Sequence, residues 1–231
     1  MKLKKIKNKT FYLAFDGFSA SGKSLGAKLI SKKYNLHLLN SGLLYRYCAF
    51  LILQHKPKNK ISFLKKKFQK LNYKKLNLLN LHNQKISNYS AIIAKQKKVR
   101  QILKKFQKKF AKKYKNVAIE GRDISTNILK NNPRYDLSFF FKCNLNTASY
   151  RRWKDLRRSN NQIKLKDVKK SLKKRNELDV NRRFSPLIRT KDSIIIRTDI
   201  LTKKEMVARM SKEIEKKLLL KYGRNYKAKQ R

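Results

Sequence analysis

The stretch Gly17–Ser24, which reads GFSASGKS, directly follows the apolar run FYLAF at residues 11–15. It matches the pattern Gly-x-x-x-x-Gly-Lys-Ser/Thr, whose glycines let consecutive backbone N–H groups point at phosphate oxygens. An apolar strand before the pattern and a helix after it are the context that the pattern requires, and the N-terminus of that helix adds positive potential. The chain has only 6 glycines, so composition alone does not account for two at this spacing. The stretch therefore predicts a nucleoside triphosphate site.

We expect the whole loop and the start of its helix to bind ATP, through Gly17, Phe18, Ser19, Ala20, Ser21, Gly22, Lys23, Ser24 and Leu25. Lys23 is placed to reach the β- and γ-phosphates, and the Ser24 hydroxyl is placed to ligate Mg²⁺. Glu120 ends a predicted strand that faces the loop, so it is a second candidate Mg²⁺ ligand, either directly or through water. Mg²⁺ is accordingly the expected cofactor, with ATP as co-substrate.

Short apolar runs alternate with helical patterns along the chain. Five runs have the length and the branched or aromatic residues of buried strands, at residues 11–15, 36–39, 117–119, 137–141 and 194–196. Apolar residues at helical spacing lie between and after them: Leu25, Leu29 and Ile30; Val99, Ile102, Leu103, Phe106 and Phe110; Met206, Val207, Met210, Ile214 and Leu218. The last set follows TKKE at residues 202–205, a capping-box pattern. This order predicts an α/β fold of the P-loop NTPase class, with a parallel five-stranded sheet flanked by helices on both sides.

We predict a single P-loop domain with four parts, the first of which is made of three segments. They are a core at 10–55, 95–143 and 184–220, an inserted element at about 56–94, a helical lid at about 144–183 and a basic, frayed tail at 221–231. The insert is Lys- and Asn-rich with apolar residues at helical spacing, and the lid is rich in arginine with little strand signal.

The composition is unusually basic. Lys+Arg 63 against Asp+Glu 13 gives a net charge of +50, which indicates either a polyanionic partner or a bias towards AT-rich codons, because Lys, Asn and Ile are all abundant. We expect nucleic-acid binding to be at most weak and nonspecific. Cys48 and Cys143 are too few for a disulfide framework, and no segment approaches the ~20 apolar residues of a membrane span. We therefore expect a cytoplasmic protein without a membrane partner, and separately we expect a monomer.

Four further segments carry a family resemblance. They are LLNSGLLYR at 38–46, SNYSAIIAKQKKVR at 87–100, EGRD at 120–123 and RNELDVNRRFSPL at 175–187. Together with the loop at 17–24, and in this order, they resemble the bacterial cytidylate kinases, which are nucleoside monophosphate kinases. The likeness covers nearly all of residues 11–215. It implies an acceptor-binding insert, a lid, and transfer of the γ-phosphoryl group of ATP to CMP or dCMP.

The resemblance also implies roles for single residues. Those expected at the cytosine are Ser41, Arg100 and Asp123; those at the ribose hydroxyls are Arg175 and Asp179; those at the acceptor phosphate are Arg46, Arg122 and Arg182. The lid arginines expected over the ATP phosphates are Arg151 and Arg152, which with Lys23, Arg122 and Arg182 make up the expected catalytic set. The residue chemistry agrees, because an arginine and an aspartate together supply the donor and the acceptor that a cytosine edge needs, and charge neutralisation carries most of phosphoryl transfer.

Three positions depart from the family pattern. Asn40 replaces the usual aspartate, Leu25 the usual threonine, and Ala91 a base-contacting serine, with Ser90 about 100° away around the helix. Two alternatives therefore stay open: a kinase of another nucleoside monophosphate such as UMP, or a P-loop nucleic-acid-binding protein that uses its charge. The chain shows no aromatic RNA-stacking pattern of the RRM type, which counts against the second alternative.

Overall fold

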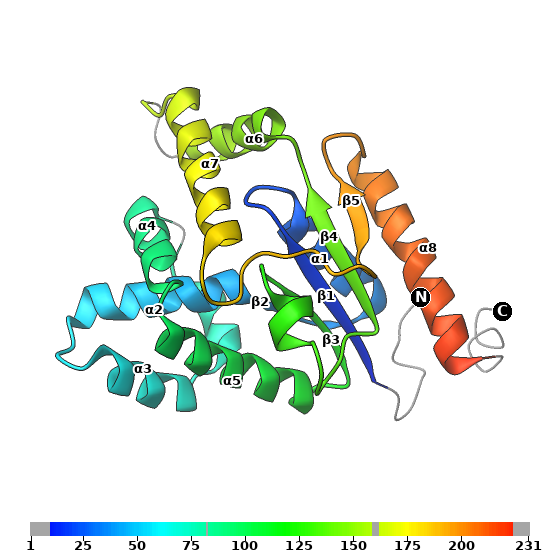
Figure 1. The fold of residues 1–231 in the computed structure, drawn as a ribbon, viewed down its shortest axis with the longest axis horizontal. Helices are drawn as coiled ribbons and strands as arrows, with labels where there is room; N and C mark the ends of the chain where they lie inside the picture. The colour runs from blue at the N-terminus through cyan, green and yellow to red at the C-terminus, as the bar shows by residue number, and fades with distance from the viewer. Residues whose placement is uncertain (1–9, 82, 159–161, 224–231) are drawn as a thin grey trace.

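A computed structural model describes residues 10–81, 83–158 and 162–223. At its centre is one sheet with the strand order β2-β3-β1-β4-β5, in which every pair of neighbours is parallel (Figure 1). The strands are β1 (Phe11–Gly17), β2 (His37–Asn40), β3 (Asn116–Glu120), β4 (Leu137–Lys142) and β5 (Ile194–Arg197). The predicted parallel five-stranded sheet is thus confirmed, with each strand beginning or ending within one or two residues of its apolar run.

The helices surround this sheet. They are α1 (Lys23–Tyr34), α2 (Ser41–His55), α3 (Lys60–Gln69), α4 (Gln84–Ile93), α5 (Lys97–Lys113), α6 (Leu145–Arg157), α7 (Leu165–Asn181) and α8 (Lys203–Tyr222), with short turns η2 (Tyr73–Leu78) and η3 (Ile124–Ile128). Asparagine side chains accept a backbone N–H at the start of α2, α3, α4 and α6. The capping box predicted from TKKE is present at the start of α8, where Thr202 and Glu205 bond each other's backbone.

Two apolar cores lie on the two faces of the sheet because side chains alternate along each strand. Leu13 and Phe15 of β1 pack with α1 and α8, whereas Ala14 belongs to the core with α2 and α5. Helices therefore cover both faces, as predicted. Leu25, which is one of the residues expected at ATP, is 38% exposed in the first turn of α1, whereas Ile30 of the same helix is buried.

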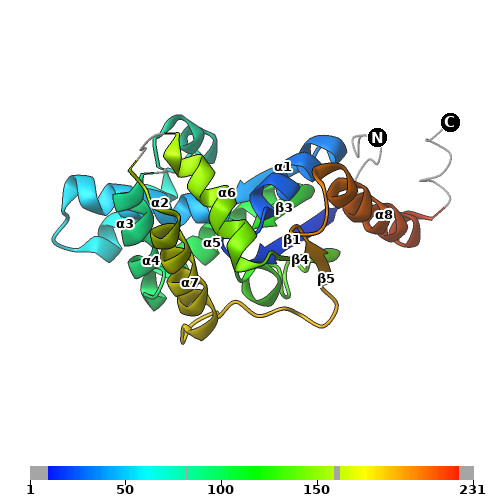
Figure 2. The same ribbon diagram turned by 90° about the horizontal axis from the view of Figure 1, so that it is seen from above.

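The stretches 56–94 and 144–183 lie outside the sheet. α3, η2 and α4 pack beside α2 and α5, whereas α6 and α7 pack on each other around Ala148, Val168 and Leu172. Figures 1 and 2 show α6 and α7 beyond the carboxyl ends of β1 and β4, the end at which α1 begins. The division into core, insert and lid remains our interpretation of this arrangement.

The C-terminal helix is longer than the sequence suggested. α8 runs through Lys221 and Tyr222, both of which bond the carbonyl of Thr10, so the predicted tail does not begin at 221. The rest of that predicted tail, from residue 224 on, lies outside the described residues. Among the helices that the structure describes, none has the length and apolar content to cross a membrane.

Candidate active site

The loop between β1 and α1 has the backbone that the glycine pattern predicts. Gly17 has φ 151°, and a Cβ there would lie 2.4 Å from the carbonyl oxygen of Phe141 on β4. Gly22, just before α1, has φ 77°, in the left-handed region that glycine tolerates best. Ala20 also has a positive φ, of 56°. The loop therefore has the bent backbone that the glycine pattern predicts, directly before the N-terminus of α1, and this arrangement suits a phosphate chain.

Lys23, Ser24 and Glu120 meet beside this loop. The Ser24 hydroxyl donates to Glu120 Oε2 at 2.7 Å, and Lys23 Nζ lies 4.0 Å from the same oxygen. Lys23 is 7% exposed, and burial together with the nearby Arg122 guanidinium lowers its pKa to about 7. A buried ammonium group repelled by a guanidinium gains strongly from an incoming anion.

A hydroxyl and a carboxylate in contact are hard oxygen donors of the kind that Mg²⁺ prefers. Ser24 and Glu120 therefore fit a Mg²⁺ ion carried in with ATP, and they would hold it beside the phosphate loop. Among the described residues, no group of three or more His, Cys, Asp or Glu side chains is arranged so that it could hold a metal ion.

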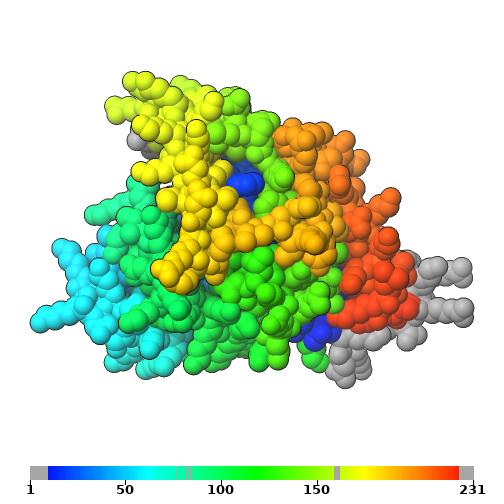
Figure 3. All heavy atoms as spheres, viewed as in Figure 1, coloured from blue at the N-terminus to red at the C-terminus, as the bar shows by residue number. Residues whose placement is uncertain are grey.

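The lid contacts the phosphate loop through Asn176 of α7. Its side-chain oxygen accepts from the Ser19 backbone N–H at 3.0 Å. The Ser19 hydroxyl in turn accepts from Arg122 at 2.9 Å. Figure 3 shows a small area of the N-terminal part of the chain, in blue, exposed in a hollow beside the lid. Sequence reasoning missed Asn176, because an asparagine within a polar helix carries no local signal.

Basic side chains from separate elements gather between the phosphate loop and the lid. Arg46 of α2, Arg122 after β3, Arg152 of α6 and Arg175 of α7 are close enough to repel one another. Burial and these neighbours lower the pKa of both Arg46 and Arg175 to about 10. All four arginines were predicted as site residues from the resemblance, and the structure places them in one cluster. Like charges held together in this way attract anions.

Asp179 links two predicted arginines. It accepts from Arg122 Nε at 2.8 Å and from Arg182 NH1 at 3.2 Å. Burial alone would raise the pKa of Asp179, but Arg122, Arg182 and Arg175 together hold it below its usual value. The Asp179 carboxylate is therefore ionised and orients the two guanidinium groups.

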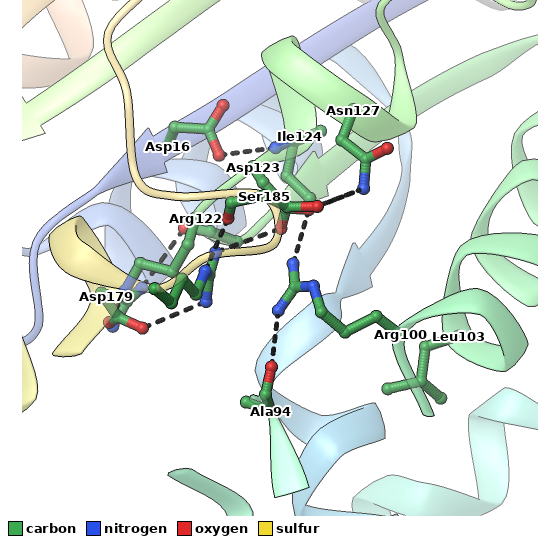
Figure 4. Close-up of polar contacts among 12 residues, drawn as sticks. Asp16, Ala94, Arg100, Leu103, Arg122, Asp123, Ile124, Asn127, Asp179 and Ser185 are labelled. Atoms are coloured by element: carbon green, nitrogen blue, oxygen red, sulfur yellow. Dashed lines mark hydrogen bonds and ion pairs between the residues drawn. The ribbon is translucent and has the colours of Figure 1, made fainter. Parts of the chain in front are cut away.

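Asp123 is the centre of a second, more buried group (Figure 4). Its carboxylate pairs with Arg100 NH2 of α5 at 2.7 Å and lies 3.7 Å from Arg182 NH2. Arg100 also donates to the Ala94 carbonyl at 3.1 Å and lies 5.6 Å from the Tyr45 ring. The predicted pair of Arg100 and Asp123 thus forms a contact.

Two residues that sequence reasoning missed hold this group. Asn127 donates from its amide to Asp123 at 2.9 Å and to the Ser185 hydroxyl at 3.1 Å. Asp16 of β1 is buried, and its carboxylate accepts from the Ile124 and Ser125 N–H groups, each at 2.8 Å, and from the Ser125 hydroxyl. An aspartate directly before the loop glycine, in an otherwise apolar strand, was a signal that could have been used.

The remaining predicted residues lie nearby. Ser41 is buried at the start of α2, and a Cβ on Gly121 would lie 3.2 Å from its Cβ. Asn40 caps α2 by accepting from the Leu43 N–H at 3.1 Å, so the residue that departs from the family pattern has a structural role. Arg151 bonds the Thr198 carbonyl at 2.7 Å, and the Thr198 hydroxyl donates to the Ser21 carbonyl. Arg151 is therefore tied to the segment after β5, whereas Arg152 belongs to the basic cluster.

Comparison with known proteins supports the fold. A solved structure of an uncharacterized protein from Eubacterium ventriosum superposes with a TM-score of 0.55 at 18% identity, covering 89% of this chain and 98% of that one. At this identity the likeness shows the fold alone.

Sequence relatives give the family. The chain is 32% identical to a cytidylate kinase of Bartonella tribocorum over 84% of this chain and 89% of that protein. It is also 32% identical to a cytidylate kinase of Mesomycoplasma hyopneumoniae, over 91% of this chain and 96% of that protein. The model of the cytidylate kinase family matches residues 13–216. The chain therefore belongs to the cytidylate kinase family.

Proposed function

We propose that this protein transfers the γ-phosphoryl group of ATP to CMP or dCMP and forms ADP with CDP or dCDP. Its family membership is the basis, and one structural observation carries the proposal at this site. A phosphate loop lies beside a half-buried cluster of arginines and an arginine–aspartate pair. Two phosphorylated molecules can then meet at the arginines while a base reaches the pair.

On the ATP side, we propose that backbone N–H groups of the loop and Lys23 hold the β- and γ-phosphates. Lys23 regains its full charge when the phosphates approach, because their negative charge opposes the effect of burial and of Arg122. Ser24 and Glu120 would hold Mg²⁺, which neutralises charge on the phosphate oxygens when bound. Arg152 supplies further positive charge from the lid, and Arg151 orders the segment around Thr198.

On the acceptor side, Arg46, Arg122 and Arg182 bind the phosphate of CMP in this proposal. Their guanidinium groups offer planar forks that fit phosphate oxygens in pairs. Arg175 and Asp179 then lie where the ribose hydroxyls would bond. Holding the acceptor phosphate in line with the γ-phosphate removes the entropy cost of bringing two anions together, which is the main task of such an enzyme.

Arg100 and Asp123 read the base. The 4-amino group of cytosine donates to a carboxylate oxygen of Asp123, while Arg100 donates to O2 and N3. Asn127 and Arg100 both donate a hydrogen bond to Asp123 Oδ2, and these two bonds hold the carboxylate in one orientation. UMP presents an oxygen in place of the 4-amino group and would set that oxygen against Asp123. The arrangement therefore favours cytosine over uracil.

We propose that the enzyme acts as a monomer in the cytoplasm, where both of its nucleotide substrates occur. A net charge of +50 opposes the association of two copies. Light scattering of the purified protein at 0.15 M salt should give a mass near 27.5 kDa, and a stable dimer would contradict this part.

The test of the activity is a panel of CMP, dCMP, UMP, AMP and GMP with ATP and Mg²⁺, read by ADP release. We expect turnover with CMP and dCMP, and a kcat/KM for UMP at least about tenfold lower, since one unpaired buried group costs roughly 1–3 kcal/mol. Equal use of UMP would support the alternative acceptor. Failure of all five acceptors to release ADP would overturn the proposal.

A further inference from the structure

A second concave site lies away from the nucleotide site. It is a groove of about 1270 Å³ between α3, the segment after it, α5 and the start of β2. None of the residues placed above at ATP, CMP or Mg²⁺ lines it. On α5 the two sites use different faces, since Arg100 points to Asp123 whereas Lys98, Lys105 and Lys109 line the groove.

The rim of the groove is strongly cationic. Four lysines of α5 line it, namely Lys98, Lys105, Lys109 and Lys113, and Lys65, Lys70 and Lys74 line it from the opposite side. All seven are exposed. Lys105, Lys109 and Lys113 follow one another at four-residue spacing, which is a rise of about 6 Å along the helix. None of the described residues that line the groove is Asp or Glu.

The stretch of sequence that forms the groove also lacks acidic residues. No Asp or Glu occurs from residue 17 to residue 119, whereas the chain from residue 120 to residue 215 has them throughout. A bias towards AT-rich codons raises lysine but does not remove Asp and Glu. The smaller hollow beside α8 shows the contrast, because there Lys33 lies 3.9 Å from Glu215.

The floor of the groove is a row of aromatic rings. The ring centroids of Tyr73 and Phe110 lie 5.7 Å apart, those of Phe110 and Tyr114 4.8 Å, and those of Tyr114 and His37 3.9 Å, with the last two rings stacked. His37 at the end of the row is exposed. A flat partner can therefore extend the stack from the solvent side.

We propose that this groove binds a single strand of nucleic acid, with its phosphates on the lysines and its bases on the aromatic row. A single strand carries one negative charge and one flat ring per nucleotide, which matches a row of lysines beside a row of rings. A second copy of this chain would bring another +50 charge and is repelled. A flat bilayer does not enter a concave groove. This surface goes beyond the kinase reaction, and it adds a defined site to the weak, nonspecific binding that the composition alone predicts.

The test compares four proteins by fluorescence anisotropy with a labelled 12-nucleotide RNA, in the presence of saturating ADP and CMP so that the nucleotide site is occupied. The groove variant carries Lys98→Gln, Lys105→Gln, Lys109→Gln and Lys113→Gln. Its matched control removes four exposed lysines of α8 through Lys203→Gln, Lys204→Gln, Lys212→Gln and Lys216→Gln. The ring variant carries His37→Thr and Tyr114→Leu. Because burial and Lys74 lower the pKa of His37, this imidazole is largely neutral at pH 7.5 and its removal changes little charge.

We expect the groove variant to bind RNA at least about tenfold more weakly than the unaltered protein. Its log Kd against log salt should be less steep by about 3, because each phosphate that a lysine neutralises adds roughly 0.7 to the slope for a single strand. The α8 control should change the Kd by less than about threefold through bulk charge. The ring variant should bind about fivefold more weakly or worse, since stacking contributes roughly 1–3 kcal/mol per base.

Three results would overturn the proposal. If the groove variant and the α8 control bound RNA equally weakly, the net charge of the protein alone would account for the binding. An unchanged Kd in the ring variant would mean that no base stacks there. Binding of a polyglutamate peptide, or of vesicles containing phosphatidylserine, as tightly as the RNA would assign the groove to another anion. Kinase turnover of all four proteins reports that each has folded.

Discussion

The ATP side and the acceptor side of this site are built from different parts of the polypeptide. The ATP side is one continuous loop, in which Gly17 and Gly22 set the backbone and Lys23 is the main charged side chain. The acceptor side is assembled from α2, α5, α7 and the segment after β3, and several of its arginines are joined to carboxylates.

Because the two sides are built differently, we expect substitutions on the ATP side and on the acceptor side to act differently. On the ATP side the loop itself contributes one cation, Lys23, so its removal subtracts one interaction from the transition state. On the acceptor side Asp123 and Asp179 each touch two arginines, so a change at one residue leaves others without a partner. Effects there should be coupled and non-additive.

The largest effect is expected for Lys23→Ala. It should lower kcat by about 100-fold or more, because the substitution removes a preorganised charge that stabilises the transferred phosphoryl group. Steady-state ADP release with saturating CMP measures it. Lys28→Ala is the matched control, since Lys28 is an exposed lysine on the same helix. Near-normal turnover of the Lys23 variant would contradict the assignment of the loop.

Asp123→Asn should act on the acceptor side alone. The substitution keeps the shape but removes the charge that pairs Arg100 and Arg182, and hydrogen bonds to charged groups contribute roughly 1.5–3 kcal/mol. We expect KM for CMP to rise about 10- to 100-fold, while KM for ATP changes by less than about twofold. Asp155→Asn, an exposed lid carboxylate, is the control. A parallel rise in KM for ATP would show that the two sides are not separate.

Arg182→Lys should have a smaller effect, because the positive charge stays and only the planar fork is removed. We expect kcat/KM for CMP to fall about tenfold, on the scale of one charged hydrogen bond, with little change in KM for ATP. The neighbouring Arg183→Lys changes an exposed arginine in the same way and serves as control. Equal damage to both substrates would remove Arg182 from the acceptor role.

The ATP side and the acceptor side also differ in how far the sequence alone could predict them. The loop was predictable residue by residue, because a backbone site depends on local glycine spacing and on a strand before a helix. The sheet was predictable because its five apolar runs are short and branched. The acceptor residues were predicted only through family resemblance, since Arg100, Asp123 and Asp179 are far apart in sequence and nothing local pairs them.

The supporting contacts could not be predicted at all. Asn176 reaches Ser19 only because α7 packs beside the phosphate loop, and Asn127 reaches Asp123, four residues before it, only because η3 winds the chain into a turn directly after Asp123. A polar residue on a helix has many alternative partners, and tertiary packing decides among them.

Asp16 connects the ATP side of the site to the acceptor side. It lies near the end of β1 just before the loop, yet its carboxylate holds the Ile124 and Ser125 N–H groups, directly after Arg122 and Asp123. In Asp16→Asn one of these N–H groups would face an amide N–H, which costs roughly 1–3 kcal/mol. Burial raises the pKa of Asp16, so the neutral amide also avoids a desolvation cost. We expect the free energy of unfolding, measured in urea, to fall by about 1 kcal/mol as the net of these two effects.

The kinetic effect of Asp16→Asn should fall on one side only. The loop on the ATP side keeps its sheet contacts through β3 and β4, whereas the segment with Arg122 and Asp123 loses its anchor. KM for CMP should then rise about threefold, on the scale of one weakened neutral hydrogen bond, with KM for ATP unchanged. Asp136→Asn is the control, because Asp136 accepts the Tyr12 N–H at 2.8 Å at the opposite end of β1. That variant should be less stable without a change in either KM. If Asp16→Asn also left both KM values unchanged, the carboxylate would stabilise the fold without positioning the acceptor residues.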